Sequence, residues 1–219
     1  MSVWVVIVAA GRGQRFGAPK QFARLGGRTL VEWSVDSARG EAQGIVLVLP
    51  PDEPDDSPGA RLARHGVAGV DVMVPGGATR SASVRAGLAA VPARAEVIVV
   101  HDGARPLASP AMFRAVVDAV RAGADGAVPA LALADTLKRV AGDVVHGTVE
   151  RDALVAVQTP QAFRAEVLRA AHAAGGEATD DAGLVEASGA TVRTVPGDPR
   201  NIKVTTTADL EIVQALASS

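Results

Sequence analysis

The amino-acid sequence predicts an α/β fold in which helices cover both faces of a doubly wound, mostly parallel sheet. Four short runs of β-branched and other apolar residues are hydrophobic almost throughout, which is typical of strands buried on both faces. Stretches with helical spacing separate these runs, and this alternation predicts parallel strands joined by right-handed crossovers. The expected strands span 3–8, 45–49, 70–74 and 96–100, and the expected helices span 29–39, 81–91 and 109–123.

Residues at the expected helix starts support these assignments. Ser109 followed by Pro110 suits an N-cap and the first helical position, and Ser81 is a candidate N-cap for the helix at 81–91. Between the expected strands at 45–49 and 70–74, the segment "PPDEPDDSPG" (50–59) is acidic and rich in proline. We expect it to be a solvated connection without a chemical role.

Residues 132–158 interrupt the alternation and predict an arm that leaves the sheet. Its short strand-like pieces are broken at Gly142-Asp143 and at Gly147, and "AGD" is a typical hairpin turn. Such an arm is the best candidate for an oligomer contact, and an ordinary surface hairpin is the alternative. The remaining chain predicts helices at about 164–174 and 181–188, a strand at 191–195 and a helix from about 207, within one domain over 1–219.

Composition excludes several classes of function. The 219 residues include 22 basic and 24 acidic side chains, so no basic field for nucleic acid or a membrane surface is expected. The absence of cysteine excludes disulfides and thiolate metal sites. The apolar run near the N-terminus has about eight residues, far fewer than the about 20 that span a bilayer. A cytoplasmic location is the default expectation.

The stretch "IVAAGRGQRFGAPKQF" (7–22) carries a strand into a glycine-rich turn with two cations. A dinucleotide fingerprint G-x-G-x-x-G fails, because Phe16 stands where the third glycine belongs and no acidic residue follows a second strand. The phosphate-loop pattern fails as well, since Ala18-Pro19 separates Gly17 from Lys20. The glycines still let backbone amides face an anion. A solvated turn is the alternative.

Arg15 and Lys20 place two positive charges beside this turn. Pro19 has a fixed φ and biases Ala18 toward extended geometry, so Lys20 is aimed by the backbone. Positioned cations of this kind stabilise negative charge that develops during phosphoryl transfer, where one preorganised donor is typically worth about 10²–10³ in rate. The segment therefore favours a phosphate-binding role.

This loop resembles the A-A-G-x-G-x-R-[MF]-G-x-x-x-P-K-Q loop of sugar-phosphate and polyol-phosphate cytidylyltransferases, with one residue fewer before Pro19. Six more segments match the same family in order, and Gly103 replaces its usual Ala. They are "PGGATRSASVRAGL" (75–88), "VVHDGARP" (99–106), "DTLK" (135–138), "TPQAF" (159–163), "TDD" (179–181) and "NIKVT" (201–205). Nearly the whole chain is thus similar to the 2-C-methyl-D-erythritol 4-phosphate cytidylyltransferase family of the non-mevalonate isoprenoid pathway.

The resemblance implies a Rossmann-like sheet of the nucleotide-diphospho-sugar transferase type and a site for CTP. Asp102 follows a predicted strand at the edge where open α/β sheets bind ligands. It would hold Mg²⁺, which favours one or two carboxylates plus phosphate oxygens; a capping Asp is the alternative. His101 is expected to be a packed neighbour without a role. The implied nucleotide-binding residues are Ala9, Ala10, Gly11, Gly13, Gly76, Gly77, Arg80, Ser83 and Asp102.

The same resemblance implies a second pocket for the acceptor, a small polyol phosphate. An arginine can grip a phosphate through two parallel hydrogen bonds. In the family the arm crosses to the neighbouring subunit, so the pocket is shared across a homodimer. The implied acceptor-binding residues are Arg105, Thr136, Arg151, Thr159 and Thr179. Asp180 and Asp181 are expected to be helix-start residues favoured by the helix dipole.

The implied reaction is an in-line attack of the acceptor phosphate on the α-phosphorus of CTP, with pyrophosphate as the leaving group. Arg15 and Lys20 would stabilise the transition state, and Lys203 would face the phosphates from the opposite side. No nucleophile with an adjacent base is suggested by the sequence, so alignment and charge neutralisation would suffice. The alternatives are another acceptor such as ribitol 5-phosphate and, more remotely, a non-catalytic nucleotide sensor.

Overall fold

The computed structural model describes residues 1–11, 13, 16–51 and 67–218. Within them, eight strands form one sheet in the order β10-β7-β11-β6-β1-β4-β5, and β12 also pairs with β7. All of these strands run in the same direction except β10 and β11. The strands are β1 (Val3–Val8), β4 (Gly44–Leu49), β5 (Val72–Pro75), β6 (Val97–Asp102), β7 (Gly126–Ala132), β10 (Val155–Val157), β11 (Gln161–Arg164) and β12 (Val192–Pro196).

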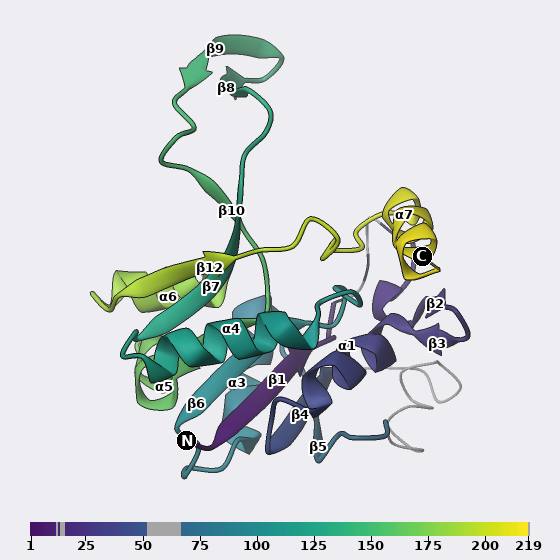
Figure 1. Cartoon of the computed structure of the whole chain (residues 1–219), viewed down its shortest axis with the longest axis vertical. Coiled ribbons are helices and arrows are strands. Elements are labelled where there is room, and N and C mark those ends of the chain that lie inside the picture. Colours follow the sequence, from purple (N-terminus) through teal and green to yellow (C-terminus); the bar gives the residue numbers. More distant parts are fainter. Residues whose placement is uncertain (12, 14–15, 52–66, 219) are drawn as a thin grey trace.

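Helices cover both faces of the sheet, which confirms the predicted doubly wound fold (Figure 1). Helices α1 (Leu30–Arg39) and α4 (Pro110–Arg121) pack on one face. Helices α3 (Arg80–Ala90), α5 (Ala165–Ala173) and α6 (Asp181–Ala187) pack on the other. Helix α7 (Thr207–Ala217) lies to one side, beside a small ribbon of β2 (Arg24–Leu25) and β3 (Arg28–Thr29).

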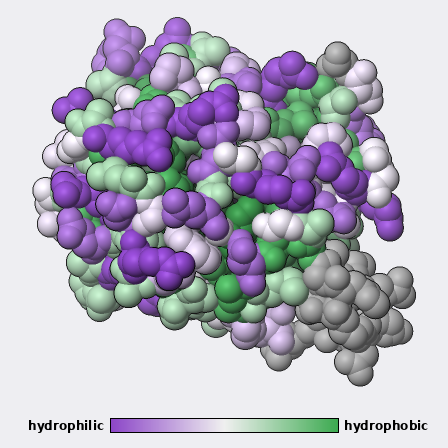
Figure 2. Space-filling model, turned by 60° about the horizontal axis from the view of Figure 1, so that its bottom comes forward, coloured by the Kyte–Doolittle hydropathy of each residue, from purple (hydrophilic) through white to green (hydrophobic). Residues whose placement is uncertain are grey.

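Two separate apolar cores explain why the strands are hydrophobic almost throughout. In β1, Val5 and Ile7 belong to the core under α1 and α4, whereas Trp4 and Val6 belong to the core under α3 and α5. Because successive strand residues point to opposite faces, a strand with helices on both sides has no solvent-facing positions. On the face turned forward in Figure 2, in contrast, hydrophilic and apolar residues are interspersed.

Capping residues fix several of the helix starts. The Thr29 hydroxyl and the Glu32 carboxylate form a capping box at α1, and Thr206 with Asp209 does the same at α7. The cap of α3 is Thr79, whose side chain accepts from the Ala82 amide. The prediction that Ser81 caps this helix is therefore wrong, because the helix begins one residue earlier, at Arg80.

The predicted start of helix α4 is confirmed, with Ser109 at the N-cap position and Pro110 as the first helical residue. The Ser109 side chain, however, makes no capping hydrogen bond. The fixed φ of Pro110 and its missing amide suit this start without a side-chain cap. The proline-rich segment 50–59 lies almost entirely outside the described residues.

The predicted arm protrudes from the sheet as a hairpin of β8 (Leu137–Ala141) and β9 (Val144–Val149) (Figure 1). The turn lies at Gly142, whose φ of 60° is in the left-handed region that glycine adopts without strain. The predicted break at Gly147 is wrong, because β9 continues through it. On the facing strand β8, the pairing register shifts between Arg139, which pairs with Gly147, and Val140, which pairs with Val145.

Candidate active site

Strand register brings the ends of four strands to one edge of the sheet. Val8, the last residue of β1, pairs with Val48 on one side and with Asp102 on the other. Leu49 of β4 pairs with Pro75 of β5. All of these strands are parallel, so the segments that follow them meet at the carboxyl edge, where open α/β sheets bind ligands.

A cleft of about 640 Å³ opens at this edge. It gathers all the nucleotide-binding residues expected from the sequence, together with Lys20 and Lys203. Arg15 lies outside the described residues. The predicted residues that line the cleft are Ala9, Ala10, Gly11, Gly13, Lys20, Gly76, Gly77, Arg80, Ser83, Asp102 and Lys203.

The described part of the glycine-rich loop folds back on itself. Gly13 has a φ of 65°, and a Cβ there would lie 1.8 Å from the carbonyl oxygen of Ala18. The amides of Phe16 and Gly17 both donate to the Gly13 carbonyl. Only glycine fits this close backbone approach. The turn leads directly to Lys20, the first residue of the short 3-10 helix η1 (Lys20–Phe22).

Gln21 braces the same loop from inside the protein. Its side chain is buried, and its Nε2 donates to the carbonyl oxygen of Gly11 at 2.9 Å. This bond ties the start of the loop to η1, and so fixes Lys20 relative to the glycines. The sequence interpretation assigned no role to Gln21, although it stands inside the matched "PKQ" segment.

The opposite wall of the cleft is formed by the loop after β5. A Cβ on Gly76 would lie 2.4 Å from the Ala10 Cβ and 2.8 Å from the Ser83 Oγ, so this wall packs directly on the start of the glycine-rich loop. Ser83 accepts from the Gly77 amide and donates to the Thr79 carbonyl. Its hydroxyl therefore holds the loop in shape at the cleft wall, where we expect a base to bind.

Asp102 lies at the floor of the cleft among three cations. Its Oδ2 is 2.7 Å from Nζ of Lys203 and 3.9 Å from Nε of Arg105, and its Oδ1 is 3.6 Å from Nε of Arg80. Burial alone would raise the pKa of this carboxyl, but the three cations oppose it and hold the pKa well below its usual range. Asp102 is therefore a carboxylate at any pH at which the protein works.

His101 and Thr159 support Asp102 from below. The Thr159 Oγ1 accepts from the Asp102 amide at 3.0 Å, so its own proton points to Nδ1 of His101, 3.1 Å away. The other ring nitrogen, Nε2, then donates to the Arg105 carbonyl. Burial lowers the pKa of His101 to about 4, so the ring is neutral and acts as a fixed relay of hydrogen bonds.

The carboxylate arrangement fits a metal ion that arrives with a phosphate ligand. Asp102 is the one carboxylate among the described residues that line the cleft. The described part of the chain contains no group of three or more His, Asp or Glu residues that could hold a metal by itself. Mg²⁺ commonly binds through one or two carboxylates while phosphate oxygens and water complete its shell.

A small third apolar cluster holds the two lysine-bearing segments together. It combines Phe16 and Leu25, which flank Lys20, with Ile202 and Val204, which flank Lys203. Val213 of α7 is fully buried in the same cluster. The separation of the two cleft lysines thus depends on packing outside the cores of the main sheet.

Comparison with known proteins identifies the family. The family of 2-C-methyl-D-erythritol 4-phosphate cytidylyltransferases matches residues 3–219. The chain belongs to this family. It is 48% identical over 220 residues to the 2-C-methyl-D-erythritol 4-phosphate cytidylyltransferase of Nocardia farcinica, covering 98% of this chain and 94% of that protein. The corresponding crystal structure from Thermus thermophilus has a TM-score of 0.80 at 37% identity and covers 98% of both chains.

A second relative spans the same length. The 2-C-methyl-D-erythritol 4-phosphate cytidylyltransferase of Saccharopolyspora erythraea is 45% identical over 226 residues, covering 99% of each chain. The resemblance inferred from seven short segments is thus confirmed over the whole chain, as is its Rossmann-like α/β fold. Membership of this cytidylyltransferase family also makes the chain a nucleotidyltransferase.

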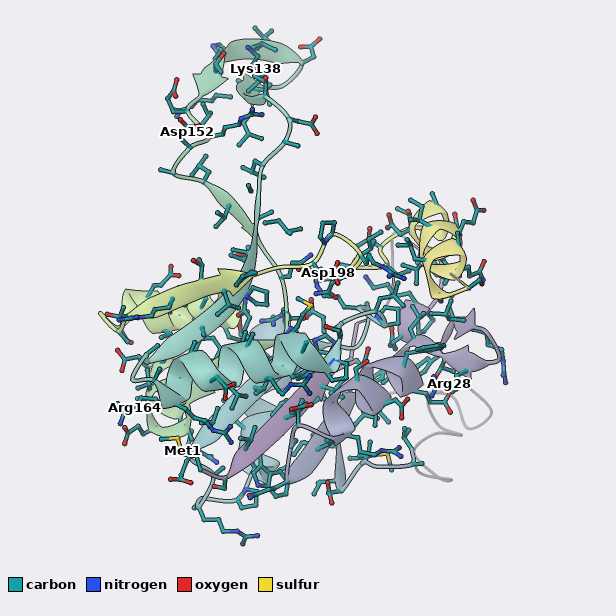
Figure 3. All side chains as sticks on the ribbon, in the orientation of Figure 1. Met1, Arg28, Lys138, Asp152, Arg164 and Asp198 are labelled. Atoms are coloured by element: carbon teal, nitrogen blue, oxygen red, sulfur yellow. The ribbon has the colours of Figure 1, made fainter. Side chains whose placement is uncertain are left out.

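The residues expected to bind the acceptor lie in three places. Arg105 and Thr159 lie beside Asp102, where Arg105 also donates to the Asn201 carbonyl at 2.7 Å. Thr179 is exposed just before α6. Thr136 and Arg151 are exposed on the arm, in the part that carries Lys138 and Asp152 in Figure 3, and Arg151 donates to the Ala134 carbonyl. None of the five predicted acceptor-binding residues is among the residues that line the cleft of the single chain.

Other cleft contacts had no assigned role in the sequence interpretation. Thr205 lines the cleft beside Lys203 and is held by Asp209, whose Oδ2 accepts from both its amide and its hydroxyl. Asn201 is buried and donates to the Thr159 carbonyl. Both belong to the matched "NIKVT" segment. The motif therefore located this part of the site, but it did not distinguish residues that face a ligand from residues that hold the backbone in place.

Proposed function

We propose that the protein transfers the cytidylyl group of CTP to 2-C-methyl-D-erythritol 4-phosphate, forming 4-diphosphocytidyl-2-C-methyl-D-erythritol and pyrophosphate. This step belongs to the non-mevalonate route to isoprenoid precursors. The observation that carries the proposal is the cleft in which Lys20, Lys203 and Asp102 meet at the carboxyl edge of the sheet. Family membership supports the identity of both substrates.

The chemistry is an in-line displacement at phosphorus. A phosphate oxygen of the acceptor attacks the α-phosphorus of CTP, the new P–O bond forms, and the bond to pyrophosphate breaks. A phosphomonoester is already nucleophilic near neutral pH, so no covalent enzyme intermediate is needed. Lys20 and Arg15 stabilise the charge that develops on the transferring group, and Lys203 faces it from the other wall.

The base would lie against the backbone of Gly76 and Gly77, which line the cleft. Neither residue could carry a Cβ, because it would lie 2.4 Å from the Ala10 Cβ or 2.5 Å from the Ala82 Cβ. Ser83 shapes this wall through its bonds to Gly77 and Thr79. Backbone amides of the glycine-rich loop face the triphosphate, because glycine permits close approach of the main chain to phosphate oxygens. We propose that Arg105, Thr159 and Thr179 bind the acceptor beside the cleft, although none of them is among the residues that line it.

We propose that Asp102 holds Mg²⁺ together with oxygens of the triphosphate. The ion would neutralise phosphate charge there, with Asp102 as its protein ligand. Lys203 is 2.7 Å from Oδ2 of the same carboxylate, so a cation bound at that oxygen would displace it and leave it available to a phosphate. Protein freed of divalent ions with EDTA should be inactive, and added Mg²⁺ should restore activity; turnover without divalent ions would refute this role.

We propose that two copies of the chain associate through the arm. Among the described residues, every exposed large apolar side chain except those of Met1 and Ile212 lies on the arm. A concentration of exposed apolar side chains on one protruding segment is typical of an interaction site. Since Thr136 and Arg151 do not reach the cleft of their own chain, a partner's cleft is where they would bind the acceptor. The exposed apolar residues of the arm are Val140, Val144, Val145, Leu154, Val155 and Val157.

Sedimentation velocity tests this assembly. Wild type should sediment as a dimer, and Val145→Asp, which places a charge on a side chain that is 58% exposed on the arm, should shift it to monomer. Ile212→Asp on α7 is the matched control, since Ile212 is 49% exposed outside the arm. A monomeric wild type, or a Val145→Asp protein that remains dimeric, would contradict the proposal.

In the described part of the chain, no helix has the length and apolar character needed to cross a membrane. We propose a cytoplasmic location, and the absence of cysteine is compatible with such a reducing compartment.

A substrate panel tests the reaction itself. Each of the four nucleoside triphosphates is mixed with 2-C-methyl-D-erythritol 4-phosphate or with ribitol 5-phosphate, with and without Mg²⁺, and pyrophosphate release is measured. We expect release only with CTP, Mg²⁺ and the methylerythritol acceptor. Preference for ribitol 5-phosphate would replace the proposed acceptor, and CTP binding without turnover on either acceptor would support a nucleotide sensor instead.

A further inference from the structure

Arg80 lies between two carboxylates, one in the cleft and one in the interior of the protein. Its Nη2 donates to Oδ2 of Asp181 at 2.7 Å, whereas its Nε is 3.6 Å from Oδ1 of Asp102. Burial lowers the pKa of the guanidinium, but Asp181 and Asp102, with a smaller contribution from Asp180, more than offset this effect, and the pKa lies above its usual value. Judged by these two distances, the interior carboxylate, Asp181, is the closer partner of Arg80.

Asp181 is in turn held from behind by a histidine. Its side chain is only 1% exposed, and its Oδ1 is 2.9 Å from Nε2 of His172, which is also buried. A carboxylate can only accept, so Nε2 carries the proton of this bond. Nδ1 of His172 is buried and has no hydrogen-bond partner among the described residues. The ring therefore makes its one hydrogen bond to Asp181.

These side chains form a row that runs from the cleft into the helical layer. Asp102 ends β6, Arg80 begins α3, Asp181 begins α6, and His172 lies in the last turn of α5. The three helices pack together on one face of the sheet, so the row spans independent elements. Acidic and basic groups alternate along it, which lets each group fix the orientation of the next.

The neighbouring Asp180 shows that Asp181 is not needed to start α6. Asp180 is the N-cap: its Oδ1 accepts from the Gly183 amide at 3.0 Å, and its Oδ2 accepts from Gln161 at 2.9 Å. The expectation that both aspartates are helix-start residues is confirmed, since Asp180 is the N-cap and Asp181 is the first residue of α6. Asp181 is directed away from the helix amides and toward Arg80 and His172.

We propose that Asp181, oriented by His172, is a positioning residue that holds the Arg80 guanidinium in place for the nucleotide. The inference rests on the proposed function, because it treats the cleft as the CTP site. Without the interior carboxylate, Arg80 would turn fully to Asp102, where it would compete with the cation that this carboxylate is proposed to hold. With Asp181 present, the guanidinium is fixed at the cleft wall before the nucleotide arrives.

The test measures CTP affinity by calorimetry on the full-length protein, without acceptor and therefore without turnover. Asp181→Asn keeps the size of the side chain and removes its charge, and it should raise the Kd for CTP by at least about tenfold, the low end for loss of a residue that orients a ligand-binding group. Glu186→Gln is the matched control, since it removes an exposed carboxylate from the same helix, and it should bind CTP as wild type does.

A double-mutant cycle distinguishes positioning from general loosening of the fold. If Asp181 acts through Arg80, adding Asp181→Asn to Arg80→Met should leave the Kd for CTP unchanged from that of Arg80→Met alone. Equal weakening in both backgrounds would overturn the proposal. A wild-type protein that fails to bind CTP would refute the proposed function, whereas tight binding by both wild type and Asp181→Asn would refute this inference alone.

Variants at His172 give an independent readout if Asp181→Asn does not fold. His172→Gln retains an N–H donor toward Asp181 and should retain CTP affinity, while His172→Leu removes the donor and should lose it. Both proteins are compared at temperatures below their unfolding transitions. Equal CTP affinity of the two variants would overturn the role of His172 and, with it, the proposed row.

Discussion

Replacement of Asp102 by asparagine is the most informative single change in the cleft. The substitution keeps the shape of the side chain and the backbone amide that donates to Thr159, but it removes the charge. Lys203, Arg80 and Arg105 then face one another without the carboxylate that lies among them. We expect the variant to lose both catalytic activity and some stability.

The size of each loss follows from burial. Breaking a fully buried ion pair by removal of one partner costs about 3–5 kcal/mol. Here the Lys203 side chain is 39% exposed and can turn into solvent, so we expect a loss of only about 1–2 kcal/mol. For a chain of this length that corresponds to a fall of about 2–8 °C in the unfolding midpoint. Turnover should fall by about 10²–10³-fold, as for loss of one preorganised electrostatic group.

Pyrophosphate release at saturating substrates and thermal unfolding measure the two losses separately. Asp118→Asn is a matched control, because Asp118 forms an exposed pair with Arg121 on α4 and should change neither quantity. An Asp102→Asn enzyme that retains turnover within about tenfold of wild type would refute the assignment of Asp102 to the reacting centre, since one lost donor is worth more than that.

Three further changes test other parts of the site. Lys20→Ala should lower turnover by at least about a hundredfold with little change in the unfolding midpoint; retained activity would contradict the role of the loop. Arg151→Ala should raise the KM for the acceptor more than the KM for CTP, and an equal rise would argue against an arm residue in the pocket. At Asp209, hydrogen bonds from Thr205 lower the pKa to about 2, so these bonds stabilise α7 above pH 3.8 and are lost as the pH falls toward 2. Asp209→Asn should therefore cost about 0.5–1 kcal/mol at pH 7 and nothing near pH 2, as thermal scans across pH would show.

The parallel half of the sheet could be predicted because each strand is covered on both faces. Strands such as 3–8 and 45–49 are apolar at consecutive positions, and a short continuous apolar run bounded by turns is typical of a strand in a covered parallel sheet. The antiparallel strands of the sheet are harder to predict from the sequence. β11 has only four residues, Gln161–Arg164, and its Gln161 is a polar residue that is buried because it bonds to Asp180 and Ala182. A strand of this kind has no periodic signal to detect.

The strand β7 was missed for a related reason. Its sequence, Gly126–Ala132, contains Pro129 and several alanines, and these residues are poor strand formers in isolation. Pairing with β11 and β12 on its two sides determines its conformation. Tertiary packing overrides local preference at such a position, so sequence pattern alone is not sufficient.

The cleft residues could be located from the sequence because the sheet itself brings them together. Gly11, Gly76 and Asp102 are far apart in the chain, but each lies at or just after the end of a parallel strand, and parallel strands end at a common edge. What the strand pattern does not specify is which side chains face ligand and which face protein. Ser83 and Thr159 both lie in matched motifs, and both have hydroxyls engaged with protein groups.

Asp180 and Asp181 show where this limit lies. Adjacent aspartates before a helix have the same propensity, the same favourable interaction with the helix dipole and the same motif around them. They separate only in three dimensions, because α6 turns one carboxylate to its own amides and the other toward α3 and α5. The second orientation depends on where Arg80 and His172 lie, and both are placed by packing on the same face of the sheet. The positioning role of Asp181 therefore arises only when the helices are assembled on the sheet. In this fold, the helical layer that covers one face of the sheet also orients Arg80, a cation of the cleft.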